Sequence, residues 1–441
     1  MSSLDEWGEA CLKNELSFYS FKGVCLVPLD TEPPEGARAV EQSFAPVAFL
    51  ISRDPLQNRF WFSVREVVEA FLEEGPAVLD SSRQNIELPF LQDARYTLLS
   101  ILVREHGAAV VNTAFPLYKA VLGTAPIRKA KGLRVNVAGL GDVGGALLTG
   151  LMLLGGDTFS EIGIYDKNSA LVARYEQELN QILPLKENAR VPRVVPIKEE
   201  VELFSGSVFL FCASRGVPNP EVCGDVRMAQ WESNRALVLP YARMARKAAF
   251  TGLFAQISDP VDFLCRDVFL ESNKDDNGRL DFMGLLPEQV RGYGLGVMAA
   301  RARYASRVLS REAVCLNLRV YGPHGNGLVA ANDPCDAYDD TLSLEITKRT
   351  IEANLRVRET GFKPYIAPGI SSACISVLRT FRGEWHEAST PLGGVYMGCR
   401  SRITQHGVEL ERAPLHEMLF KRIEASFSGI KNTEAPWSLR S

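Results

Sequence analysis

A glycine-rich turn at residues 139–144, Gly-Leu-Gly-Asp-Val-Gly, carries the strongest chemical signal in the sequence. In such a turn the first glycine permits a tight reversal, the second lets the backbone approach a pyrophosphate, and the third lets the next helix pack closely. A short strand is expected at Leu133 to Ala138, before the turn, and a helical pattern follows the turn, which is the context that supports a dinucleotide site. The residues expected to contact the dinucleotide are Gly139, Gly141, Asp142, Val143 and Gly144.

Asp166 indicates which dinucleotide is bound. It follows the second predicted strand, 27 residues after Gly139. A carboxylate at this point accepts hydrogen bonds from the adenosine ribose and repels a 2′-phosphate, so the sequence predicts NAD rather than NADP. Lys167 beside it weakens that preference slightly. The alternative is that Asp166 is an ordinary turn residue at the end of a strand.

The composition narrows the class of protein. A chain of 441 residues suggests two or three domains, and 46% hydrophobic with 23% charged residues is typical of a globular protein. The net charge of −4 argues against a nucleic-acid or anionic-membrane partner. Because no apolar run reaches the roughly 18 residues of a membrane span, and the start lacks a signal-peptide pattern, we expect a cytoplasmic protein. Nine scattered cysteines without a CxxC pair favour free thiols over zinc or disulfides.

Strands and helices alternate after residue 133, which predicts a parallel sheet. The expected strands are 133–138, 162–165, 207–212 and 253–258, and the expected helices are 146–154, 170–182 and 228–247. Beyond Pro260 we expect a lobe of mixed helices and strands. Its expected helices are 287–308, 343–359, 369–382 and 415–427, and its expected strands are 313–321, 394–400 and 402–405.

The N-terminal part has its own pattern, with strands expected at 23–28 and 46–51, helices at 64–74 and 94–105, and a linker at 127–132. The predicted fold class is therefore α/β: a Rossmann-type parallel-sheet domain, an α+β substrate lobe, and a separate N-terminal α/β domain. The predicted boundaries are 1–132, 133–262 and 263–432, with a tail at 433–441.

From about Leu133 onward the chain resembles the lactate/malate dehydrogenase family, over roughly 300 residues. The resemblance rests on the glycine turn and on motifs in the family's order. These are Ile257-Ser-Asp-Pro-Val-Asp262, Arg301-Ala-Arg-Tyr304, Tyr321-Gly-Pro-His-Gly-Asn326 and Val395-Tyr-Met-Gly398. The first 130 or so residues have no recognised counterpart.

The resemblance implies a role for several polar residues. His324 matches the catalytic histidine, which exchanges a proton with the substrate oxygen. Arg301 matches the arginine that holds the substrate carboxylate. Arg227 matches the loop arginine that stabilises the developing alkoxide, and Asn234 the asparagine at the start of the next helix. Arg215 corresponds to the specificity arginine of malate-type members, although the loop here is longer; an exposed loop cation is the alternative.

Two residues depart from the family pattern. Met298 stands where the family has the aspartate that pairs with the histidine, and Asp259 stands where it has an asparagine. We hypothesise that Asp259 replaces the missing aspartate and orients His324, which requires the two side chains to lie within direct or water-bridged contact.

The sequence therefore predicts an NAD-dependent oxidoreductase that moves a hydride between nicotinamide and a 2-hydroxy or 2-oxo acid. The alternative is an NAD(H)-binding sensor or scaffold that has lost the chemistry. The resemblance also implies a homo-oligomer. No metal site is predicted, because the acidic cluster Asp333, Asp336, Asp339 and Asp340 is interpreted as a surface loop.

Overall fold

The computed structural model describes residues 16–83, 93–123, 132–187, 189–215 and 226–438, with side chains described outside 226–228 and 434–438. The chain forms two compact units. Unit 1 comprises the N-terminal part to residue 128 together with 392–394 and 403–414, and unit 2 comprises 129–391, 395–402 and 415–441. The expected linker at 127–132 lies mostly outside the described residues.

Unit 2 contains a parallel sheet in the order β9-β8-β7-β10-β11-β12. In chain order the strands are β7 (Leu133–Ala138), β8 (Phe159–Tyr165), β9 (Arg193–Pro196), β10 (Val208–Phe211), β11 (Leu253–Gln256) and β12 (Val290–Gly292). Renumbered from β7, this order is 3-2-1-4-5-6, that of a doubly wound dinucleotide-binding sheet. The predicted Rossmann-type fold is confirmed.

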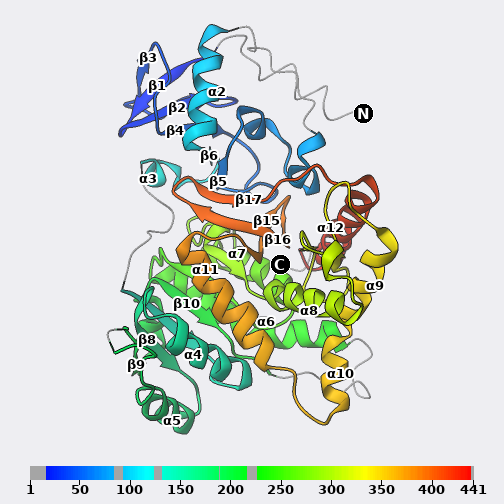
Figure 1. The fold of residues 1–441 in the computed structure, drawn as a ribbon. Coiled ribbons are helices and arrows are strands. Elements are labelled where there is room, and N and C mark those ends of the chain that lie inside the picture. Colours follow the sequence, from blue (N-terminus) through cyan, green and yellow to red (C-terminus); the bar gives the residue numbers. More distant parts are fainter. Residues whose placement is uncertain (1–15, 84–92, 124–131, 188, 216–225, 439–441) are drawn as a thin grey trace. The chain divides into compact units, whose positions relative to one another are not determined.

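The helices of this sheet arise from apolar segments that pack on it. They are α4 (Asp142–Leu154), α5 (Ser169–Leu179), α6 (Val226–Lys247) and α7 (Val261–Ser272), and Figure 1 shows α4 and α5 beside β8 and β9. Helix α4 is apolar on most of its surface because it also packs against a π-helical segment, Pro368–Ile375. Asn168 caps the N-terminus of α5 by accepting the Ala170 N–H.

The prediction of a helix at 287–308 was wrong for the residues before Leu295. The structure has strand β12 there, and the helix α8 (Leu295–Val308) begins only after Gly294. A three-residue strand that contains an arginine and a glycine shows no period-2 alternation, so its sequence gives no strand signal. Strand β15 (His386–Leu392), antiparallel to β12, was missed as well.

The rest of unit 2 carries the loop that presents His324. Strands β13 (Arg319–Tyr321) and β14 (Val329–Ala331) form an antiparallel pair, with His324 in the connection. A buried apolar cluster joins this pair to α8 and to α9 (Asp340–Ile351). The remaining elements are α10 (Ala353–Glu359), α11 (Ser376–Arg382), β16 (Val395–Thr404) and α12 (Glu417–Ser438).

Unit 1 is a mixed sheet in the order β3-β1-β2-β4-β6-β5-β17. Its strands are β1 (Phe18–Phe21), β2 (Val24–Pro28), β3 (Arg38–Val40), β4 (Val47–Ile51), β5 (Trp61–Val64), β6 (Ala108–Asn112) and β17 (Gly407–Leu410). Helix α2 (Ala94–His106) packs on its apolar core through Leu99 and Val103. The predicted helix 64–74 is instead a short 3-10 helix, Val67–Phe71.

The two compact units divide the chain differently from the predicted boundaries. The predicted domains 133–262 and 263–432 fall together in unit 2, except for residues 392–394 and 403–414, which belong to unit 1. Strand β17 pairs in parallel with β5, Val408 opposite Phe62, and Arg412 forms an ion pair with Glu69. Pairing between strands so distant in the sequence depends on tertiary packing, and local pattern does not reveal it.

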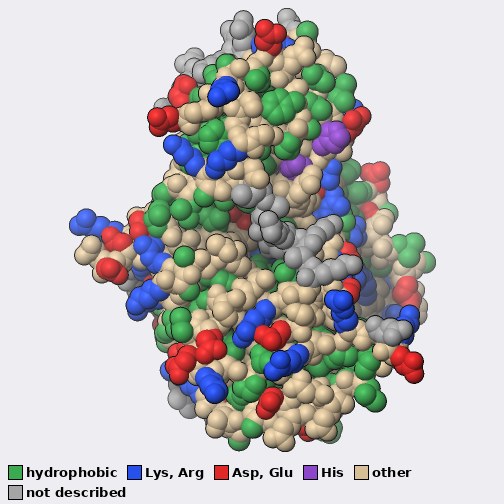
Figure 2. Space-filling view, turned by 90° about the vertical axis from the view of Figure 1, so that its left-hand side faces the viewer, with side chains coloured by type: hydrophobic (Ala, Val, Ile, Leu, Met, Phe, Trp, Pro, Cys, Tyr) green, Lys and Arg blue, Asp and Glu red, His purple; other side chains and the backbone are tan. Residues whose placement is uncertain are grey.

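Surface charge is mixed. Basic and acidic side chains are interspersed on the face shown in Figure 2. Within the described ranges, no helix combines the length and the apolar character that a membrane span requires.

Candidate active site

The glycine turn connects β7 to α4 and leaves room above the backbone for a ligand. Gly139 has a positive φ of 97°, and a Cβ there would lie 2.4 Å from the Ala213 backbone nitrogen. A Cβ at Gly144 would lie 2.1 Å from the Gly139 carbonyl oxygen, whereas one at Gly141 would meet no atom within 4 Å. Gly139 and Gly144 therefore allow close packing of the backbone. Gly141 leaves open space where a pyrophosphate would approach the N-terminus of α4.

Asp166 lies directly beside this turn. Its Oδ2 accepts the Leu140 N–H at 2.8 Å and its Oδ1 accepts the Asn168 N–H at 2.8 Å. The carboxylate thus ties the end of β8 to the glycine turn, in the place where an adenosine ribose would lie. Asp142, in the first turn of α4, pairs with Lys363 at 2.9 Å. These residues fit a dinucleotide.

His324 and Asp259 are in direct contact, as the sequence hypothesis required. The Nδ1 atom of His324 lies 2.6 Å from Oδ1 of Asp259, in the loop between β11 and α7. The Nε2 atom of His324 is buried and has no hydrogen-bond partner. The imidazole is therefore held at Nδ1, while Nε2 has no hydrogen-bond partner in the protein.

Asp262 fixes the backbone of the histidine loop. Its Oδ2 accepts the His324 backbone N–H at 3.0 Å, and its Oδ1 accepts the Ser389 hydroxyl at 2.7 Å. Gly294 also matters, because a Cβ there would lie 2.9 Å from Cβ and Cγ of His324. Residues from α7, β15 and the start of α8 thus position one imidazole.

The electrostatics favour a protonated imidazole. Burial by itself disfavours the imidazolium, but the Asp259 carboxylate outweighs it, and the pKa of His324 is raised above its ordinary value. The positive charge of Arg301 opposes this increase. The raised pKa extends to higher pH the range in which the imidazolium, with a proton on Nε2, is present.

Arg301 is the second cation of the site. It lies on α8, and its only described hydrogen bond is to the sulfur of Met298, at 3.7 Å. Burial lowers the pKa of Arg301 and the Asp259 charge opposes that shift, but a guanidinium stays charged in proteins. A thioether is a weak acceptor, so Met298 leaves this charge without an anionic partner in direct contact.

Asn234, on α6, links two loops of the sheet. Its Nδ2 donates to the Asp259 carbonyl at 2.6 Å, and its Oδ1 accepts the Arg215 backbone N–H at 3.0 Å and the Ser214 hydroxyl at 3.3 Å. Arg215 itself is exposed. The backbone of Arg227 lies in α6, while its side chain lies outside the described residues. Substrate roles for these three residues remain predictions.

The assembled residues lie at the carboxyl ends of the parallel strands, where ligands bind in sheets of this kind. Gly139 follows β7, Arg215 follows β10, Asp259 follows β11 and Gly294 follows β12. Sequence reasoning missed Asp262 and Ser389 as site residues. Asp262 belongs to the motif that contains Asp259 and could have been found there, whereas Ser389 lies in a strand with no motif.

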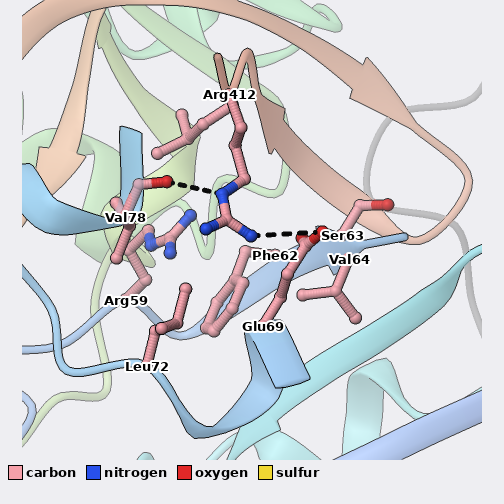
Figure 3. A pocket seen from close by; sticks show the side chains of 9 residues that line it. Arg59, Phe62, Ser63, Val64, Glu69, Leu72, Val78 and Arg412 are labelled. Atoms are coloured by element: carbon pink, nitrogen blue, oxygen red, sulfur yellow. Dashed lines mark hydrogen bonds and ion pairs between the residues drawn. The ribbon is translucent and has the colours of Figure 1, made fainter. Parts of the chain in front are cut away.

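Unit 1 contains a polar grouping of its own. Unit 1 has a small pocket, drawn in Figure 3, where Arg412 donates to the Val78 carbonyl oxygen and pairs with Glu69. Its other guanidinium, that of Arg59, pairs with Glu74. Both guanidinium groups of the pocket therefore have carboxylate partners within unit 1. Across the described ranges, His, Cys, Asp and Glu side chains form no metal-binding cluster.

Comparison with known proteins supports the fold. No family model matches the sequence, and neither does any curated protein. The structure is similar to a lactate dehydrogenase from a Medee basin deep-sea metagenome library, with a TM-score of 0.56 and 18% identity over 70% of this chain and 100% of that one. It is also similar to a minor L-lactate dehydrogenase from Enterococcus mundtii, with a TM-score of 0.56 and 18% identity over 69% and 98% of the two chains. Unit 2 therefore has a lactate dehydrogenase-like fold.

Proposed function

We propose that this protein is an NAD-dependent oxidoreductase that interconverts a 2-oxo acid and a 2-hydroxy acid. The observation that carries the proposal is the His324 imidazole, with Nδ1 on the Asp259 carboxylate and Nε2 buried without a partner. The fold, shared with lactate dehydrogenases, and the glycine turn support it.

His324 is the proton donor in the direction of reduction. The imidazolium gives its Nε2 proton to the carbonyl oxygen of the 2-oxo acid, which becomes the hydroxyl of the product. Asp259 holds the ring at Nδ1 and stabilises the charged form before the transfer. In the opposite direction neutral His324 takes the hydroxyl proton, and Asp259 stabilises the imidazolium that results.

Arg301 binds the substrate carboxylate. Its guanidinium has only a thioether contact among the described residues, and a planar fork of donors matches a carboxylate. Together with His324 it places the carbonyl group between a cation and a proton donor. Arg227 is proposed to stabilise the developing alkoxide, and Asn234 and Arg215 to line the substrate side.

The cofactor is held by the glycine turn and Asp166. When bound, NAD accepts the substrate hydride and NADH supplies it. The backbone at Gly141 and the start of α4 would hold the pyrophosphate, and Asp166 the adenosine ribose. The Asp166 carboxylate disfavours a 2′-phosphate, which supports NAD over NADP.

A second candidate is an NAD(H)-binding sensor without turnover. Met298 at the place of the family's aspartate, and the use of Asn234 to link two loops, favour it. The two candidates predict the same cofactor affinity but different chemistry.

Two measurements separate them. Absorbance at the NADH band, followed with a panel of 2-oxo acids, should show turnover that His324→Asn abolishes. Fluorescence titration should show that NADH still binds to the variant. NADH binding by the wild type without turnover on any acid would favour the sensor, and failure to bind NADH would refute both.

A further inference from the structure

A fully buried arginine to which the proposed function assigns no role lies inside unit 2. Arg291, on β12, is 0% exposed. Its Nη2 donates to the Ser401 hydroxyl at 2.7 Å, whereas its Nε and Nη1 are buried and have no hydrogen-bond partner. A guanidinium cannot discharge itself by losing a proton at accessible pH. The unit therefore contains a permanent positive charge with two unused donors.

The surrounding groups do not neutralise this charge. No described carboxylate forms an ion pair with Arg291. Its charge acts on His386. Its charge and a side-chain hydrogen bond act to lower the pKa of the Tyr293 phenol, but burial outweighs them and raises that pKa, so the phenol stays neutral. The Tyr293 hydroxyl and the Nε2 of His386 each lie 2.9 Å from the Thr380 hydroxyl. These neutral groups satisfy one another and contribute no negative charge.

A further unused hydroxyl lies on the neighbouring strand. Gly292 of β12 pairs antiparallel with Ser389 of β15, and this register puts Thr390 opposite Arg291. Thr390 is 0% exposed, and its Oγ1 has no hydrogen-bond partner. Two buried strands therefore present unpaired polar atoms, from Arg291 and Thr390, at adjacent positions.

We propose that Arg291 holds a small inorganic anion of the size of chloride inside unit 2, with the Thr390 hydroxyl as a second donor. Burying an isolated charge costs far more than burying a neutral polar group, so the folded state gains from a bound counter-ion. The site is closed, because Arg291, Thr390 and Ser401 are each 0% exposed. An organic substrate is excluded by that closure. A water molecule would satisfy the N–H groups but leave the charge.

The test is the dependence of thermal stability on chloride at constant ionic strength, with gluconate as the replacing anion. A ligand that binds the folded state alone raises the melting temperature by mass action. We expect a saturating rise of roughly 3 °C between zero and 200 mM chloride for the wild type. Bromide should act similarly and should give an anomalous scattering peak beside the Arg291 guanidinium in a crystal.

Variants show whether the effect belongs to this site. Arg291→Met should remove the chloride dependence, and Thr390→Val should shift its midpoint to higher chloride. Arg174→Met, which changes an exposed arginine on α5, should leave it unchanged. If Arg291→Met does not fold, the proposal is tested by the chloride dependence of Thr390→Val and by the bromide peak in the wild-type crystal.

Three outcomes would overturn the proposal. The wild type could show no chloride dependence, Arg291→Met could retain the full dependence, or the crystal could show water in place of bromide at the guanidinium. None of these measurements involves NADH or turnover, so they are independent of the proposed function.

Discussion

The imidazole of His324 is held at Nδ1 by the carboxylate of Asp259, 65 residues earlier in the chain, at 2.6 Å. Met298, which the sequence resemblance places at the position of a partner aspartate, contacts Arg301. In this chain the carboxylate that contacts the imidazole lies in the loop after β11, and the contact uses Nδ1 and not Nε2.

Replacing Asp259 should lower the pKa of His324. The carboxylate raises that pKa in the folded protein, and reduction requires the imidazolium, so activity is high below this pKa and falls above it. In Asp259→Asn the falling limb of the pH–rate profile should move to lower pH, and kcat at neutral pH should drop by about 100-fold or more. Asp276→Asn, an exposed carboxylate, is the matched control. An unchanged profile in Asp259→Asn would contradict the pairing.

Removing the Arg301 guanidinium should weaken substrate binding. Arg301→Met is expected to raise KM for the 2-oxo acid by roughly 10²-fold, because loss of a desolvated charge pair costs that much binding energy. Arg303→Met, two residues along on a more exposed side chain, should leave KM within a factor of about two. Equal effects of the two variants in steady-state kinetics would argue against a carboxylate clamp at Arg301.

Substitutions at two glycines of the turn should have different effects, one on the stability of the fold and the other on NADH binding. A Cβ at residue 144 would collide with the Gly139 carbonyl oxygen, while one at residue 141 meets open space. We expect Gly144→Ala to lose about 1–3 kcal/mol of stability through overpacking. Gly141→Ala should melt like the wild type but bind NADH several-fold more weakly. Thermal unfolding and fluorescence titration measure the two effects, and normal NADH affinity in Gly141→Ala would place the pyrophosphate elsewhere.

Asp166 should control the choice of cofactor. Asp166→Ser removes the charge that disfavours a 2′-phosphate, so the ratio of the Kd for NADPH to that for NADH should fall by about tenfold. Because Asp166 also accepts the Leu140 N–H, some affinity for NADH should be lost as well. The same titration with both nucleotides provides the internal control. An unchanged ratio of the two Kd values would indicate that Asp166 has only a structural role.

The sequence by itself determined the Rossmann half of unit 2. A continuous apolar run defines β10, and the turn at Gly139 to Gly144 requires backbone conformations and close approaches that only glycine provides. These are local requirements, so a local pattern reveals them. The positions of His324, Arg301 and Asp259 could also be identified, through motifs that resemble a family.

Only the tertiary structure decided how those residues meet. The contact between Asp259 and His324 depends on the packing of the α7 loop against the β13–β14 connection, and Asp262 and Ser389 join it through bonds across three elements. Strand β12 and the assignment of residues 403–414 to unit 1 were also decided there. Short strands are stabilised by pairing with strands that are distant in the sequence. The residue pattern within one short segment does not show which distant strand it pairs with.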